Sequence, residues 1–191
     1  MAKTYWMKIT ILNGNPYEDN KTFESYLDEV ALALDDLGLD VITVTLRDKN
    51  IHSCTGCWGC WVKNPGECSI PDDSGEIRDK IIHSDLIIFA SPLIMGFTSA
   101  LLKILQDKLI PLLHPYLEIV NNEIHHQKRY DQYPGLALLF QPEPETDDED
   151  IQIVTDIYHR FSINFKSELL FSKSVETPIE KLVNEIIHYQ R

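Results

Sequence analysis

Hydrophobic residues along the chain follow two patterns, short continuous apolar runs and longer stretches with an apolar residue at every third or fourth position. The short runs are rich in β-branched residues and end at turn-forming residues, which is typical of buried strands. The longer stretches have the period of a helix with one apolar face. Strands are therefore predicted at 7–12, 41–46, 86–90 and 136–140, with a half-exposed edge strand at 163–171.

Helices are predicted between these strands and after the last one. The first has an apolar stripe that ends before Gly38, formed by Phe23, Tyr26, Leu27, Val30, Ala31, Leu34 and Leu37. Asp73 with Glu76 and Thr177 with Glu180 are spaced as capping boxes, which predicts two further helix starts. Thr98 or Ser99 is expected to cap another helix.

A strand followed by a helix, repeated five times, predicts a parallel sheet with helices on both faces. Five strands fit the order 2-1-3-4-5, so we expect a three-layer α/β protein with the flavodoxin-like fold. The 191 residues suit one domain. The polar stretch 114–134 is predicted to be an irregular insertion and is a candidate dimer interface or lid.

Charge and composition narrow the class of protein. The net charge of −13 argues against binding to nucleic acids or anionic membranes. No apolar run approaches the roughly 20 residues that cross a bilayer. The first residues pass straight into a predicted strand, so we expect a cytoplasmic protein without a leader.

In the predicted fold the loops 13–22, 91–99 and 141–149 meet at the carboxyl ends of strands 1, 3 and 4. The first loop leads into a helix N-terminus, where free amides and the helix dipole favour a phosphate. The side chains of Asn15, Asn20 and Thr22 could add donors. The plainer alternative is that this segment is only a turn followed by a helix cap.

Two of these loops resemble those of NAD(P)H-dependent FMN reductases. Gly14-Asn15-Pro16 and the later Thr22 resemble the phosphate loop, and the segment 91–103 resembles the second flavin loop, whose backbone binds the isoalloxazine edge. The resemblance spans about residues 7–111 and implies FMN as cofactor. The cofactor-binding residues that we predict are Asn13, Asn15, Asn20, Thr22, Ser91, Pro92, Leu93, Ile94, Met95, Gly96 and Gln141.

The chain departs from that family at three places. Tyr17 stands where the phosphate loop usually has an arginine, and two acidic residues follow it. Ile94 and Met95 replace the aromatic residues that often stack on the flavin. The third loop, 143–150, is strongly acidic and lacks glycine, which disfavours the phosphates of NADPH.

The four cysteines, Cys54, Cys57, Cys60 and Cys68, have the spacing C-x2-C-x2-C-x7-C. In a reducing compartment such clustering points to metal or redox chemistry. Structural or redox-sensitive thiols are the preferred interpretation. The loop also resembles the cysteine motif of iron–sulfur flavoproteins, which implies a 4Fe–4S cluster on these four residues. Zinc is the third alternative.

The favoured function is an FMN-dependent oxidoreductase that passes electrons from NAD(P)H or another donor to a small acceptor such as a quinone or nitro compound. The cofactor carries this chemistry, so no catalytic side chain is predicted. Family members are commonly dimers, so a homodimer is expected. An electron carrier with FMN and a cluster, and a flavin-free scaffold that binds a partner, are the alternatives. His125 and His126 are expected to face solvent.

Overall fold

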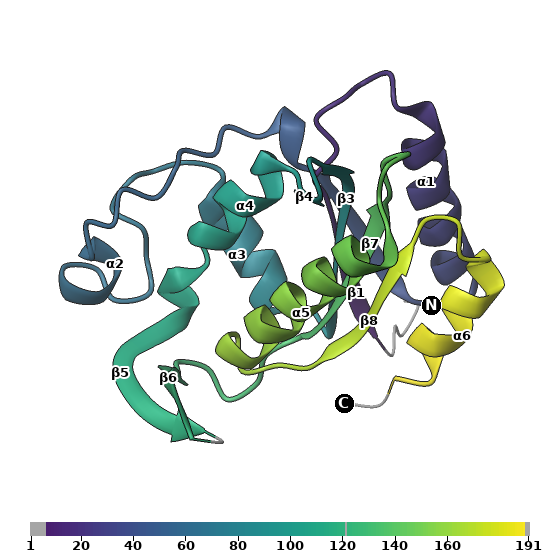
Figure 1. Cartoon of the computed structure of the whole chain (residues 1–191). Coiled ribbons are helices and arrows are strands. Elements are labelled where there is room, and N and C mark those ends of the chain that lie inside the picture. The colour runs from purple at the N-terminus through teal and green to yellow at the C-terminus, as the bar shows by residue number, and fades with distance from the viewer. Residues whose placement is uncertain (1–6, 121, 190–191) are drawn as a thin grey trace.

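The structure is a computed structural model that describes residues 7–120 and 122–189. Its strands are β1 (Lys8–Asn13), β2 (Asp40–Thr45), β3 (Leu86–Ile94), β4 (Phe97–Thr98), β5 (Leu113–Val120), β6 (Glu123–Lys128), β7 (Gly135–Gln141) and β8 (Leu169–Ser174). Its helices are α1 (Lys21–Asp36), α2 (Gly59–Val62), α3 (Ser74–Ile82), α4 (Ala100–Asp107), α5 (Asp148–Asn164) and α6 (Ile179–Ile187), with 3-10 turns η1 (Leu46–Asp48) and η2 (Ile110–Leu112) (Figure 1).

The main sheet has the order β2-β1-β3-β7-β8, and its neighbouring strands are parallel. Ranked along the chain, these five strands have the order 2-1-3-4-5, so the predicted fold is confirmed. The short β4 pairs antiparallel with the end of β3. The register places Asn13 beside both Thr45 and Ala90, which aligns the carboxyl ends of the three neighbouring strands at one edge.

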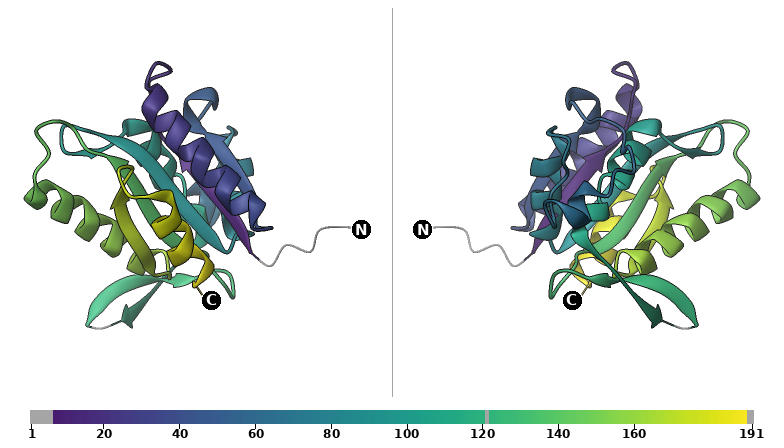
Figure 2. Two further views of the ribbon diagram at one scale, coloured as in Figure 1. Left: turned by 90° about the vertical axis from the view of Figure 1, so that its right-hand side faces the viewer. Right: turned by 90° about the vertical axis from the view of Figure 1, so that its left-hand side faces the viewer.

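Helices cover both faces of this sheet. α1 and α6 lie on one face, whereas α3, α4 and α5 lie on the other (Figures 1 and 2). Successive residues of β3 contribute to opposite cores: Ile88 packs with the α1 side, and Ile87 and Phe89 pack with the α5 side. Burial on both faces explains why this strand is a continuous apolar run in the sequence.

The prediction of an irregular insertion at 114–134 is wrong. Most of this segment is an antiparallel hairpin of β5 and β6, which projects below the main sheet in Figure 1. Within the hairpin Leu117 and Ile119 alternate with Glu118, which is the period of a strand. The many polar residues obscured this alternation, because both faces of a projecting hairpin carry some of them.

The predicted edge strand at 163–171 is also wrong in its first half. Helix α5 continues to Asn164 because Tyr158, Phe161 and Phe165 keep the helical spacing into the core. Lys166 then adopts a φ of 58°, and the amide of Ser167 donates to the Ser162 carbonyl, which ends the helix. The strand β8 begins only at Leu169.

Several predicted element ends are shifted. β3 does not stop before Ser91 but continues to Ile94. Asp73 precedes α3 without a capping hydrogen bond from its side chain, and the N-cap of α6 is Pro178, not Thr177. Ser99 caps α4 as predicted, since its hydroxyl accepts from the Leu102 amide. None of the helices in the described residues is long and apolar enough to cross a membrane.

Candidate functional site

The three loops predicted to form a crevice do meet at the carboxyl edge of the sheet. The Asn20 side-chain amide donates to Gln141 Oε1 at 2.6 Å, which joins the first loop to the third. The Gly96 backbone amide donates to Glu143 Oε2 at 3.0 Å, which joins the second loop to the third. The topology therefore brings these residues together from three separate strands.

The first and second loops are also held together directly. Gly14 donates its amide to the Ala90 carbonyl, and the Ser99 hydroxyl donates to the Gly14 carbonyl at 2.5 Å. The Ser99 amide donates in turn to the Ser91 hydroxyl. A side chain at position 14 would collide with Leu102, so the loop needs glycine there. These bonds pin the ends of both loops to the sheet.

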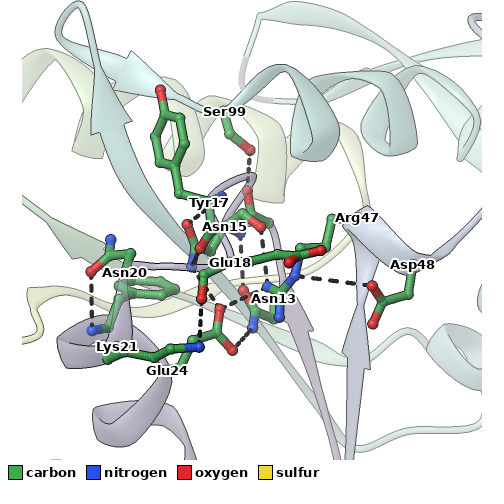
Figure 3. Close-up of polar contacts among 12 residues, drawn as sticks. Asn13, Asn15, Tyr17, Glu18, Asn20, Lys21, Glu24, Arg47, Asp48 and Ser99 are labelled. Atoms are coloured by element: carbon green, nitrogen blue, oxygen red, sulfur yellow. Dashed lines mark hydrogen bonds and ion pairs between the residues drawn. The ribbon is translucent and has the colours of Figure 1, made fainter.

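Asn13 and Asn15 shape the first loop from within (Figure 3). Asn15 is fully buried; its Oδ1 accepts from the Tyr17 amide, and its Nδ2 donates to the Tyr17 carbonyl and to Glu24 Oε1. Asn13 Oδ1 accepts from the Asn15 amide, and Asn13 Nδ2 donates to Glu24 Oε2. Both side chains are thus engaged inside the loop, and their role toward a cofactor stays a prediction.

Arg47 and Glu24 form an ion pair beneath this loop that sequence reasoning missed. Arg47 Nη1 lies 2.8 Å from Glu24 Oε1 and also donates to the Asn15 carbonyl. Burial alone would raise the pKa of Glu24, but hydrogen bonds from Asn15, Arg47 and Asn13 outweigh it and lower the pKa. The available signal was an arginine two residues after the end of β2, the strand beside β1.

The N-terminus of α1 faces the same loop. Asn20 is its N-cap, with Oδ1 accepting from the Phe23 amide, whereas Thr22 is exposed inside the first turn and does not cap. Within the described part of the chain, the backbone amides of Glu18, Asp19 and Thr22 have no hydrogen-bond acceptor. Free amides at a helix N-terminus are the groups that bind phosphate in other proteins.

The second loop is a tight hairpin turn. Ile94 pairs with Phe97, and the two residues between them, Met95 and Gly96, have φ values of 55° and 75°. Positive φ at both central positions is typical of a type I′ turn, which leaves the turn backbone at the surface. Met95 is 94% exposed. Leu93 is buried, and Ile94 is half-buried.

All four cysteines line one cavity of about 90 Å³ away from this crevice. The cysteines are free: Cys54 and Cys57 are exposed, Cys60 is buried and Cys68 is half-buried. Among the described residues, no group of three or more His, Cys, Asp or Glu side chains is placed to hold a metal ion. The four cysteines therefore share one cavity, but their side chains are not arranged to bind a single metal ion.

A buried lysine, Lys108, lines this cavity. Lys108 Nζ donates to Cys68 Sγ at 3.1 Å and lies 2.9 Å from Asp72 Oδ2, and both charged side chains are 1% exposed. Burial alone would lower the pKa of Lys108, but the hydrogen bonds to Asp72 and Cys68 raise it. The amide of Gly59 lowers the pKa of Cys57 by hydrogen bonding, whereas burial raises that of Cys60. A cation beside a thiol favours the thiolate, the form that binds metal.

The expectation that both hairpin histidines face solvent is wrong for His125. Its side chain is buried, with Nδ1 2.8 Å from Asn164 Oδ1 and Nε2 3.2 Å from Glu123 Oε2. His126 is half-buried and packs on Trp61 with ring centroids 4.8 Å apart. Because the two residues are adjacent in β6, their rings lie on opposite faces of the hairpin.

Comparison with known proteins adds independent information. The family model for NADPH-dependent FMN reductase matches residues 7–128. An iron–sulfur flavoprotein of Methanocaldococcus jannaschii is 36% identical over 106 residues, which are 56% of this chain and 53% of that protein. An iron–sulfur flavoprotein of Archaeoglobus fulgidus is 32% identical over 108 residues, 56% of this chain and 48% of that protein. The chain thus spans about half the length of these curated relatives.

Solved structures agree with the fold. A structure described as a putative quinone reductase from Klebsiella pneumoniae superposes with a TM-score of 0.66 at 13% identity, over 94% of this chain and 82% of that one. At such identity the similarity shows the fold alone. The family match, however, covers more than half of the chain and includes the first two loops of the crevice. The chain belongs to the NADPH-dependent FMN reductase family, whose members are flavin-dependent oxidoreductases of flavodoxin-like fold.

Proposed function

We propose that this protein holds FMN in the crevice and passes electrons from a reduced nicotinamide, or another donor, to a small acceptor. One observation carries the proposal. Two donors that suit a flavin phosphate and ring edge, the Asn20 side-chain amide and the Gly96 backbone amide, each bind an oxygen of the third loop, on Gln141 and Glu143. Those oxygens occupy positions that acceptor atoms of a cofactor would take.

Different residues around the crevice would bind the phosphate and the ring of FMN. Free amides at Glu18, Asp19 and Thr22, with the Asn20 side chain, would hold the phosphate at the start of α1. The backbone of the turn at Leu93–Gly96 would hold the ring edge. When bound, FMN supplies hydride and one-electron chemistry. The chain would supply the position of the ring and the polarity around it.

Binding of FMN and riboflavin tests this assignment. FMN should bind with about one equivalent per chain, and riboflavin should bind more weakly because it lacks the phosphate. Phosphate contacts through charge-assisted hydrogen bonds are worth roughly 1.5–3 kcal/mol each. Fluorescence titration measures both affinities, and equal affinities would show that the first loop does not bind phosphate.

A second activity is supported by the cysteine cavity. We propose that Cys54, Cys57, Cys60 and Cys68 ligate a 4Fe–4S cluster, which would make the protein an electron carrier as well as a reductase. Each thiolate of such a cluster binds a different iron, and all four cysteines line one cavity here. Lys108 Nζ donates a hydrogen bond to Cys68 Sγ and would offset part of the negative charge of the bound cluster. The relatives named as iron–sulfur flavoproteins support the same assignment over the free thiols that the sequence favoured.

Metal analysis of anaerobically purified protein separates these alternatives. The cluster predicts about four iron atoms and four sulfides per chain, with broad visible absorption. Replacing Cys57 and Cys60 by serine should remove the iron and leave FMN binding intact, whereas Ser53→Ala in the same loop should change neither. Iron-free wild-type protein with normal FMN content would leave only the thiol or zinc alternatives, and zinc would appear in the same analysis.

We further propose a homodimer in the cytoplasm as the working form. Four free cysteines suit a reducing compartment. The acidic third loop disfavours the additional phosphate of NADPH, so the identity of the donor is best decided by comparing NADH and NADPH as reductants of the bound flavin. No membrane or nucleic acid is among the proposed partners.

A further inference from the structure

A second, larger cavity lies beside the cysteines and away from the flavin crevice. Its volume is about 580 Å³, within the range of small-molecule sites. It opens between the end of the cysteine loop, helix α3 and the segments that flank the β5–β6 hairpin. We call it the arginine cleft, and its principal lining residues are Arg78, Arg129, Tyr130, Ile82, Leu112 and Cys68.

The two arginines of this cleft lack acidic partners. Of the four arginines that the structure describes, Arg47 and Arg160 pair with glutamates, whereas Arg78 and Arg129 form no ion pair with any described residue. Arg78 is only 8% exposed. A buried charge is normally paired, so the unpaired Arg78, with the half-buried and unpaired Arg129 in the same cleft of a protein with net charge −13, indicates a missing anion.

Each guanidinium group is held by hydrogen bonds and still has N–H groups without an acceptor among the described residues. Arg78 Nη1 donates to the Ser74 hydroxyl and the Lys108 carbonyl. Arg129 donates from Nε to the Pro111 carbonyl and from Nη2 to the Leu113 carbonyl. These bonds leave Nη2 of Arg78 and Nη1 of Arg129 without an acceptor in the described part of the chain. Neither atom is a buried unsatisfied group, so both reach open space.

The carboxylates of the cleft do not neutralise these charges. Asp72 pairs with Lys108, and Asp79 lies 3.3 Å from His83. Glu67 is the remaining acidic residue in the lining and is exposed. The interior of the cleft is therefore electropositive at the two arginines.

We propose that the arginine cleft binds a small organic anion, with a carboxylate or phosphate group between the two guanidinium groups and its apolar body against Ile82, Leu112 and Tyr130. Arginine is the residue that binds both anion types with paired hydrogen bonds. Cys68 and Ile70 line this cleft and the cysteine cavity alike. The anion thus binds next to the cysteines, whatever group they hold.

Calorimetric titration of the 191-residue chain with three probes tests this site. Benzoate and phenyl phosphate should bind, and neutral benzamide should bind at least about ten-fold more weakly, because one charge-assisted pair is worth that much. Tighter binding of phenyl phosphate identifies a phosphate ligand, and tighter binding of benzoate identifies a carboxylate. Equal binding of benzamide and benzoate overturns the proposal.

Variants locate the site. Arg78→Gln should weaken benzoate binding about ten-fold or more, whereas Arg160→Gln, an exposed arginine elsewhere, should not change it. Gly75 lies in the first turn of α3, and a Cβ atom built there would lie 3.8 Å from Arg78 Nη2. Gly75→Glu should therefore supply an internal carboxylate and abolish benzoate binding in a folded protein. Gly75→Gln is its neutral control, and equal affinity in the two Gly75 variants contradicts the assignment.

Discussion

Tyr17 is an exposed side chain beside the N-terminus of α1, followed by the acidic Glu18 and Asp19. An arginine at this position would reach a phosphate held by the free amides of the loop. Tyr17→Arg should therefore tighten FMN binding by roughly 1.5–3 kcal/mol, most visibly at low salt. Fluorescence titration at two salt concentrations measures the effect.

Riboflavin is the internal control for this substitution, because it lacks the phosphate that the arginine would contact. Its affinity should stay nearly unchanged in the Tyr17→Arg variant. An equal gain for both ligands would mean that Tyr17 lies away from the phosphate.

Glu143 holds the Gly96 amide that the flavin ring is proposed to use. Glu143→Ala removes both this competing acceptor and a negative charge near the crevice. FMN affinity should rise by roughly 1 kcal/mol, about five-fold. Glu145→Ala is the matched control, since it removes an exposed charge of the same loop that makes no such bond. If the two variants bind FMN equally well, Glu143 does not compete for the site.

Single residues of the crevice were only partly predictable. The sequence placed Asn13, Asn15 and Asn20 correctly at the strand end and helix start, because turn residues and helix spacing are local signals. It could not show that Glu24 and Arg47 bind the first two from below. Glu24 lies on α1 and Arg47 lies 34 positions after Asn13, in the turn that follows β2, so only the packing of β1, β2 and α1 brings these residues together.

At the scale of elements, strongly periodic segments were predictable and projecting ones were not. α1 was identified because its buried apolar residues recur every three or four positions. β3 was identified because it is a continuous apolar run that contributes to both cores. The β5–β6 hairpin was missed since little of it faces a core. The true end of α5 was missed because its last apolar residues, Ile163 and Phe165, also alternate like a strand.

The ion pair of Asp72 and Lys108 fastens the cysteine loop to the end of α4. Both side chains are 1% exposed, so breaking the pair leaves the buried charge of Lys108 without a carboxylate, with Cys68 Sγ as its remaining side-chain partner. Asp72→Asn should therefore lower the free energy of unfolding by about 3–5 kcal/mol. Asp79→Asn, which removes an exposed carboxylate, should cost less than about 0.5 kcal/mol. Urea unfolding at neutral pH measures both, and similar small losses would contradict a structural role for the pair.

The same pair predicts a pH dependence of stability. Burial alone would raise the pKa of Asp72, but hydrogen bonds from Ser74 and Lys108 hold it well below its usual range. A carboxylate whose pKa is lower in the folded than in the unfolded state stabilises the fold at pH values above its unfolded pKa, which is about 4. This stabilisation is lost as the pH falls further. The wild-type protein should thus lose stability below about pH 4 more steeply than Asp72→Asn. If the free energy of unfolding falls equally steeply with pH in the two proteins, Asp72 is not the cause of the loss of stability in acid.

At the scale of the whole molecule, the sheet order followed from few rules. Five strand–helix repeats with right-handed crossovers predict a parallel sheet with helices on both faces, and 2-1-3-4-5 is one of the common orders of such sheets. The site at the carboxyl ends of the strands follows from that order. The cysteine cavity and the arginine cleft do not follow from any such rule. They depend on how the loop after β2 packs against α3, α4 and the hairpin, which no local pattern encodes.

One face of the hairpin packs against the end of α5, whereas the opposite face contacts Trp61 through His126 and is otherwise exposed at its apolar residues. Glu118 accepts a hydrogen bond from Lys166 at 2.6 Å, and His125 contacts Asn164, so these two residues face the end of α5. Alternation in a strand then directs their neighbours to the opposite face. The exposed apolar side chains on that opposite face are Leu117, Ile119 and Ile124.

The exposed part of this opposite face is where we expect the homodimer to form. Ile119 and Ile124 lie opposite each other in the hairpin and are 77% and 70% exposed, so covering them with a second copy would remove apolar surface from water. Ile119→Lys should convert the dimer to a monomer in sedimentation velocity at micromolar concentration. Leu32→Lys, a similarly exposed position on α1, should leave the dimer intact. A wild-type monomer at that concentration, or equal dissociation of both variants, would place any interface elsewhere, because only a substitution inside a small apolar contact should dissociate it.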